Sequence, residues 1–166
     1  GGPILLAPHA LEMIALTAAA SRFETRVAKF AEHKSELQFL SENFKKYTDP
    51  IQRLRVLLGQ SNLDLEVRRD LEKASNLLEE GRSGLGAREV ALWFNTALHE
   101  AASSENRALT PRIVASSFRN LMDRKKLSIA GKDRRLSRVV DDSRNFGPYA
   151  ALVGDAHEVA DAQRIG

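Results

Sequence analysis

The feature that most constrains this fold is a long apolar stripe near the start of the chain. Apolar side chains recur mostly at spacings of three and four residues from Met13 to Phe44, the pattern of an amphipathic helix that faces a core. No glycine or proline lies between Ala10 and Thr48. The stripe therefore predicts one long N-terminal helix over about residues 10–47, roughly 55 Å long at ~1.5 Å per residue. We expect this helix to be the spine of the fold.

Helix start and stop signals divide the rest of the chain into further helices. Asp49 and Thr110 each precede a proline, so that the first side chain can cap a helix and the proline can take its first position. Gly59 is a good helix stop. The apolar ladder from Leu63 to Leu78 indicates a helix that returns antiparallel to the first one. The sequence predicts an all-α fold, a bundle of about five to seven helices.

The segment 81–86, GRSGLG, is the candidate for a hinge. It lacks the GxxxxGK[ST] pattern of a phosphate-binding loop, and it follows a helix where such a loop would follow a strand. We therefore interpret it as a loop between helices. In the next helix, Trp93 and Phe94 are the largest apolar pair of the sequence, and we expect them in the core rather than in a ligand cage.

Length and composition indicate one domain. The 166 residues are typical of a single helical domain over 1–166, and the start Gly-Gly-Pro without methionine suggests a fragment of a larger protein. The chain has no cysteine, which excludes disulfides and thiolate chemistry. The apolar residues from Ile4 to Ala20 include His9 and Glu12 and have no basic start, so they indicate neither a signal peptide nor a membrane span. We expect a soluble, cytoplasmic protein, and the sequence does not indicate its oligomeric state.

The residues that could support catalysis are scattered. Four histidines stand far apart in the sequence, and none lies three or four residues from another (His9, His33, His99 and His157). His99-Glu100 begins like a zinc-protease helix, but the second histidine of HExxH is absent. Adjacent carboxylates such as Glu79 and Glu80 point to different faces of a helix and cannot converge. The sequence does not indicate an enzyme, and it predicts no cofactor and no metal ligands.

Positive charge is concentrated in one window. Residues 107–138 hold ten basic residues against two acidic ones, whereas residues 1–83 are balanced. A spacing of seven would put Arg112, Arg119 and Lys126 on one helix face, with Ser116 between them as a hydrogen-bond donor to phosphate. The candidate residues for binding a macromolecule are Arg112, Arg119, Arg124, Lys125, Lys126, Arg134, Arg135 and Arg138. The alternative is that these side chains are only solvent-exposed charges on two adjacent helices and bind no partner.

Two hypotheses about function follow from these patterns. The first is a non-catalytic binding module that presents helix faces to a protein partner, with docking in the groove between the long helix and its antiparallel neighbour. Part of the apolar stripe, at the Met13 to Phe23 end, must be covered by the C-terminal helices or by a partner, and we expect an interface there. The alternative is sequence-independent binding of DNA or RNA through the basic 107–138 face. Phe118 is the only aromatic residue within that cluster and its spacing assigns it to the core, which disfavours stacking on single strands.

Overall fold

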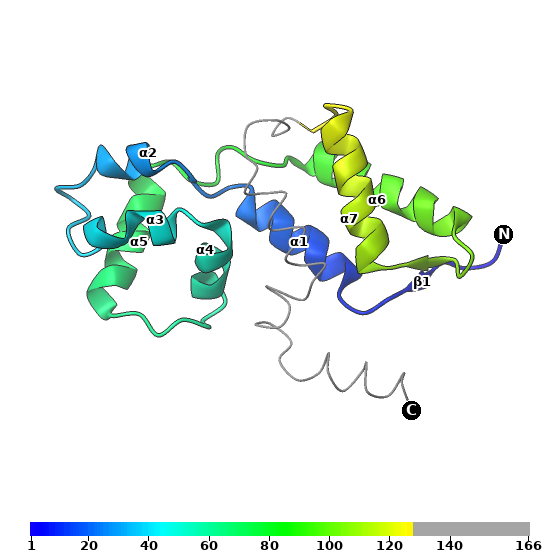
Figure 1. The fold of residues 1–166 in the computed structure, drawn as a ribbon, viewed down its shortest axis with the longest axis horizontal. Coiled ribbons are helices and arrows are strands. Elements are labelled where there is room, and N and C mark those ends of the chain that lie inside the picture. Colours follow the sequence, from blue (N-terminus) through cyan, green and yellow to red (C-terminus); the bar gives the residue numbers. More distant parts are fainter. Residues whose placement is uncertain (128–166) are drawn as a thin grey trace.

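The computed structural model describes residues 1–127, in which helices are the main regular structure and are joined by turns and loops (Figure 1). The strands β1 (Leu5–Leu6) and β2 (Ala108–Leu109) form one short parallel pair, and the single turn η1 (Ser41–Asn43) precedes α3. The helices are α1 (Ala10–Ala20), α2 (Val27–Ala31), α3 (Phe44–Tyr47), α4 (Pro50–Leu57), α5 (Leu65–Leu77), α6 (Ala87–Ser103) and α7 (Pro111–Asp123). The predicted all-α bundle is confirmed by these seven α-helices of the described part.

The single long helix predicted over residues 10–47 is wrong. The helical path stops at Ala20 and is replaced by α2, loops, η1 and α3. Carboxylates take backbone N–H groups that a continuous helix would bond internally: Glu24 accepts the N–H groups of Thr25 and Arg26 at 3.0 and 2.9 Å. Further along, Asp70 accepts those of residues 39 and 40. Most apolar side chains of the stripe are nevertheless buried, because the chain folds back on itself.

The buried side chains form two cores. The first core lies among α1, α4, α6 and α7. At its centre Trp93 stacks on Phe118 with ring centroids 4.7 Å apart, and its indole N–H lies 2.9 Å from the carbonyl oxygen of Val114 and 3.1 Å from Ser117 Oγ. Trp93 is fully buried and Phe94 packs partly buried against this core, so both belong to it as predicted.

The second core lies among α2, α3, α5 and the loop that precedes η1. It gathers the distal half of the predicted stripe with the apolar face of α5 (Phe30, Leu37, Leu40, Phe44, Tyr47, Leu71 and Ala74). Thus α5 packs against this second core, whereas the neighbours of α1 are α4, α6 and α7. In Figure 1, α1 lies between α4 on one side and α6 and α7 on the other.

A buried ion pair connects a helix of the first core with the segment that follows a helix of the second core. The guanidinium of Arg53 on α4 donates to Glu80 Oε1 at 2.9 Å and also bonds Oε2, while Ser75 Oγ donates to Glu80 at 2.9 Å. The side chains of Arg53 and Glu80 are each only 6% exposed. Arg53 also lies over the ring of Phe23, 4.7 Å from its centroid. The pair ties α4 to the segment that follows α5.

The predicted helix ends are confirmed where they depend on neighbouring residues. The side chain of Asp49 accepts the N–H of Ile51 at 3.0 Å, and Thr110 Oγ1 accepts that of Ile113 at 3.3 Å. After α4 the chain turns through Gly59, whose φ of 71° lies in the left-handed region that favours glycine.

Candidate functional site

An open apolar groove lies between α1 and α6. Its volume is about 520 Å³, and ten residues line it (Leu11, Ile14, Ala15, Ala18, Arg22, Leu85, Ala87, Val90, Ala91 and Phe94). Leu11 has 46% of its surface exposed although it is apolar. The groove runs along a different face of α1 from the predicted stripe, because the stripe residues Met13, Leu16 and Ala20 are buried in the first core.

Both helices contribute the same pattern to the groove. From α1 come Leu11, Ile14, Ala15 and Ala18, and from α6 come Ala87, Val90, Ala91 and Phe94, each set spaced i, i+3, i+4 and i+7. These stripes border the faces that fill the first core: Ile14 belongs to that core, and Val90 and Phe94 pack partly buried against it. The outer residues of the two stripes are exposed (Leu11, Ala15, Ala87 and Ala91), so the edge of each apolar face is open at the groove.

Arg22 closes one end of the groove. Its guanidinium donates to the carbonyl oxygen of Gly81 at 2.7 Å and to that of Leu85 at 3.1 Å. These bonds place the end of α1 beside the start of α6, where Ser21 Oγ also accepts the N–H of Leu85 at 2.9 Å. The approach is so close that a Cβ at Gly84 would lie 2.6 Å from the carbonyl oxygen of Ser21.

These contacts involve the loop 81–86, which the sequence predicts to be a hinge. Four hydrogen bonds join the loop to residues 21 and 22, two at Gly81 and two at Leu85, and Gly84 lies close against Ser21. Its backbone is fixed against α1 in this structure. Whether it opens as a hinge stays a prediction.

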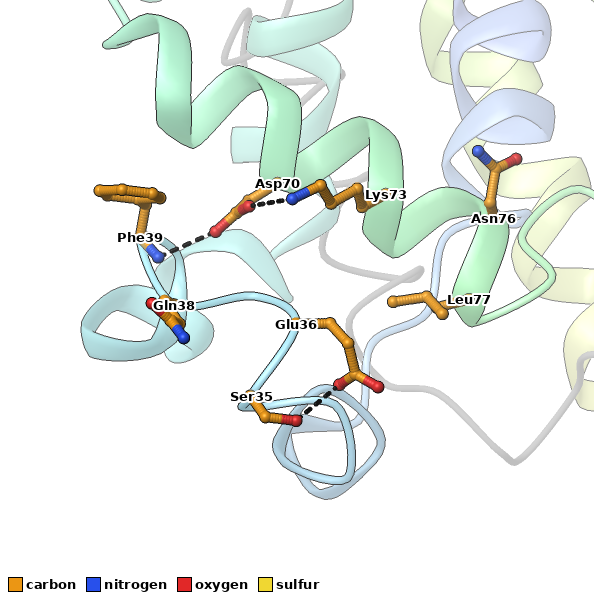
Figure 2. A pocket seen from close by; sticks show the side chains of 8 residues that line it. All are labelled: Ser35, Glu36, Gln38, Phe39, Asp70, Lys73, Asn76 and Leu77. Carbon is orange, nitrogen blue, oxygen red and sulfur yellow. Dashed lines mark hydrogen bonds and ion pairs between the residues drawn. The ribbon is translucent and has the colours of Figure 1, made fainter.

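A second hollow, of about 570 Å³, lies between α5 and the loop around residues 35–39 (Figure 2). Its two carboxylates have partners within the chain. Asp70 accepts the N–H of Phe39 at 2.8 Å and lies 3.6 Å from Lys73 Nζ, and Ser35 Oγ donates to Glu36 at 3.1 Å. The arrangement holds the loop against α5 and does not form a catalytic pair. Within residues 1–127 no group of three His, Asp or Glu side chains could hold a metal ion.

The basic residues of the sequence hypothesis are only partly brought together. Arg112, Arg124, Lys125 and Lys126 are exposed, and Arg119 is half-buried. The expectation that Lys126 continues the face of Arg112 and Arg119 is wrong, because α7 ends at Asp123. The chain there turns through Lys125 at a φ of 54°, and the N–H of Lys126 bonds the carbonyl of Leu121 at 2.9 Å.

An acidic side chain also lies on this face. Ser116 Oγ donates to Glu100 Oε2 at 2.8 Å, and Asn120 Nδ2 donates to Glu100 Oε1 at 3.1 Å. Ser116, which the sequence offers as a donor to phosphate, is thus bonded to a carboxylate of α6. Three further candidates, Arg134, Arg135 and Arg138, lie outside the described residues.

Sequence reasoning placed an interface at the N-terminal stripe and missed the groove, because the stripe residues Met13, Leu16 and Ala20 are buried in the first core. Val90 and Phe94 were predicted to face the interior, and they both pack against that core and line the groove. The available signal was in α1, where Glu12 is the only charged side chain and apolar residues surround the helix. The neighbour of α1 in the groove is α6, and not the helix that ends near Leu78.

Comparisons of the chain with protein-family models, with curated proteins and with solved structures find no match. Among residues 1–127, no helix combines the length and the apolar character needed to cross a membrane. The function is therefore argued from the geometry of this chain.

Proposed function

We propose that this chain is a non-catalytic binding module that receives an amphipathic helix of a protein partner in the groove between α1 and α6. The observation that carries the proposal is the pair of apolar stripes, spaced i, i+3, i+4 and i+7, that meet along this groove and whose outer residues are exposed (Leu11, Ala15, Ala87 and Ala91). An amphipathic helix laid into such a groove buries its own apolar face against both stripes.

The dimensions and side chains of the groove suit a helix. It follows α1 from Leu11 to Arg22, which corresponds to about 17 Å at ~1.5 Å per residue, or about three helical turns. Four alanines lie among the lining residues (Ala15, Ala18, Ala87 and Ala91). Small side chains let a third helix approach within the usual helix packing distance of about 8–10 Å.

The test is a selection from a displayed library of 16-residue helix-forming peptides with apolar residues fixed at i, i+3, i+4 and i+7. Peptides are selected on the full chain and then titrated against the variants Ala15→Glu and Ala91→Glu. Both alanines are exposed, so the variants should fold normally, which circular dichroism checks. The matched control is Leu92→Glu, which changes an exposed residue of α6 outside the groove.

We expect peptides that bind the wild-type chain and Leu92→Glu equally, and that bind each groove variant at least about tenfold more weakly because docking would bury an unpaired charge. A selection in which no peptide distinguishes the groove variants from the control would refute the proposal.

The alternative proposal, sequence-independent nucleic-acid binding, is supported by Arg124, Lys125 and Lys126, which are consecutive and exposed at the end of α7. Titration of the chain with duplex and single-stranded DNA or RNA at two salt concentrations tests it. Binding through phosphates should weaken steeply as salt rises. No binding at low salt, or affinity that hardly changes with salt, would eliminate this alternative.

A further inference from the structure

Arg22 is the one charged residue among the ten that line the groove. Its two hydrogen-bond partners from the described chain are carbonyl oxygens, those of Gly81 and Leu85, which carry no net charge. A guanidinium has more N–H donors than two carbonyls use. Arg22 therefore holds a full positive charge and spare donors at the end of an apolar surface.

The carboxylates nearest in the chain already have cationic partners. Glu24 bonds Arg26 through Nη2 at 2.8 Å, and Glu80 forms the buried pair with Arg53. None of the ion pairs formed within residues 1–127 includes Arg22. On its other side Arg22 borders a hollow that Glu24, Glu79 and Glu80 also line, but each of these carboxylates is paired with another arginine, and Arg22 forms no ion pair within residues 1–127.

The two carbonyl bonds also hold the guanidinium in place. One anchors it to Gly81 and the other to the residue just before α6, so its orientation is set before any ligand arrives. A preoriented guanidinium can bind a carboxylate through two parallel hydrogen bonds, with a smaller loss of side-chain freedom than a mobile one.

We infer that the helix bound in the groove carries an Asp or Glu at the end that lies beside Arg22, one turn beyond its apolar stripe. This inference rests on the proposed function and specifies the chemistry of the partner. Apolar contacts along Leu11 to Ala18 supply the area buried, and the carboxylate fixes the direction of the helix. A helix inserted the other way round would leave Arg22 facing apolar side chains.

The experiment is a double-mutant cycle. A peptide selected on the groove is made in two forms, with Glu or Gln at the position one turn beyond its stripe, and each is titrated against the wild-type chain and Arg22→Gln. Because Arg22→Gln also removes the bonds to Gly81 and Leu85, only the difference between the two peptides on the same protein is read. Arg22→Lys, which keeps the charge, serves as a second variant.

On the wild-type chain we expect the Glu form to bind about three- to fivefold more tightly than the Gln form, and this ratio to shrink in high salt. On Arg22→Gln the ratio should fall to about one, and Arg22→Lys should keep part of it. Equal binding of both forms by the wild-type chain, with sensitivity to Ala15→Glu retained, would overturn the inference and leave the proposed function standing.

Two other results would overturn it in distinguishable ways. If no peptide depends on the groove at all, the proposed function fails first. If the chain alone dimerises in sedimentation experiments and Ala15→Glu makes it monomeric, the occupant is a second copy of the chain and not a partner helix with an acidic end.

Discussion

The two cores of this molecule are built in different ways. Around Trp93, helices of 17 and 13 residues (α6 and α7) pack through regular apolar stripes. Around Phe30, α5 has 13 residues, but the helices α2 and α3 that pack on it have only five and four, and much of the rest is loop. There the carboxylate of Asp70, 2% exposed, holds the loop by its backbone.

The difference shows that a three-and-four spacing of apolar residues does not specify a continuous helix. Successive turns and short helices bury the same positions when a polar side chain bonds the backbone between them. The first core should therefore be most sensitive to lost volume, and the second to a lost hydrogen-bond acceptor.

The largest loss of stability is expected from a substitution in the first core. Trp93→Ala removes the largest fully buried side chain and should lower the free energy of unfolding by about 3–5 kcal/mol. Trp93→Phe keeps most of the volume and loses the indole N–H, so its cost should be smaller, about 1–2 kcal/mol. Urea denaturation followed by circular dichroism measures both. Equal costs for the two variants would show that the hydrogen bonds, and not the volume, dominate this core.

An intermediate effect is expected in the second core. Asp70→Ala leaves the N–H groups of Phe39 and Leu40 without their acceptor and should cost about 2 kcal/mol. Hydrogen exchange should accelerate at these two amides and not in α6. Asp70→Asn keeps one acceptor oxygen and should lose less. Unchanged hydrogen exchange at residues 39 and 40 in Asp70→Ala would show that the second core does not depend on this hydrogen-bond acceptor, and would contradict the proposed difference between the cores.

The smallest loss of stability is expected in the segment that follows α1 and leads to the second core. The hydrogen bond from the side chain of Arg26 lowers the pKa of Glu24 from its ordinary value of 4.5, with burial opposing it. A lowered folded-state pKa means that the stabilisation is present above about pH 4.5 and is lost as the pH falls through the folded value. Glu24→Gln should cost less than about 1 kcal/mol at pH 7, because Arg26 is exposed.

Thermal melts between pH 3 and pH 7 measure this difference. The melting temperatures of the wild-type chain and Glu24→Gln should converge in acid. A gap that stays constant across this range would contradict the assignment of the effect to the Glu24 carboxylate.

The features that are predicted correctly from the sequence are those that depend on residues close together in the chain. The caps at Asp49 and Thr110 and the core position of Trp93 depend on local chemistry and periodicity, and the structure confirms them. The breaks in the predicted long helix also depend on distant partners: Glu80 accepts the N–H of Glu24 from 56 residues away, and Asp70 accepts that of Phe39 from 31 residues away. No local pattern reveals these partners, although the bonds of Glu24 to the next two N–H groups are local.

The same limit applies to the candidate sites. A stripe of apolar residues shows that a face of α1 must be covered, but not whether the cover is α4, α6 or a partner. Likewise, the bond of Ser116 to Glu100 joins residues 16 apart on two helices, so the spacing of the basic residues alone could not show that a carboxylate lies on their face.

The paired links at residues 21–24 and 80–85 have a consequence for how the chain folds. Arg22 and Gly81 are 59 residues apart in sequence, yet they bond at 2.7 Å and lie where the chain leaves α1 and later returns to α6. Residues 27–78 are therefore nested within the unit formed by α1, α6 and α7. We expect that assembly of α2 to α5 brings the two ends of this insert together, so that α1 can meet α6 across a short effective loop and at a lower entropy cost of closure.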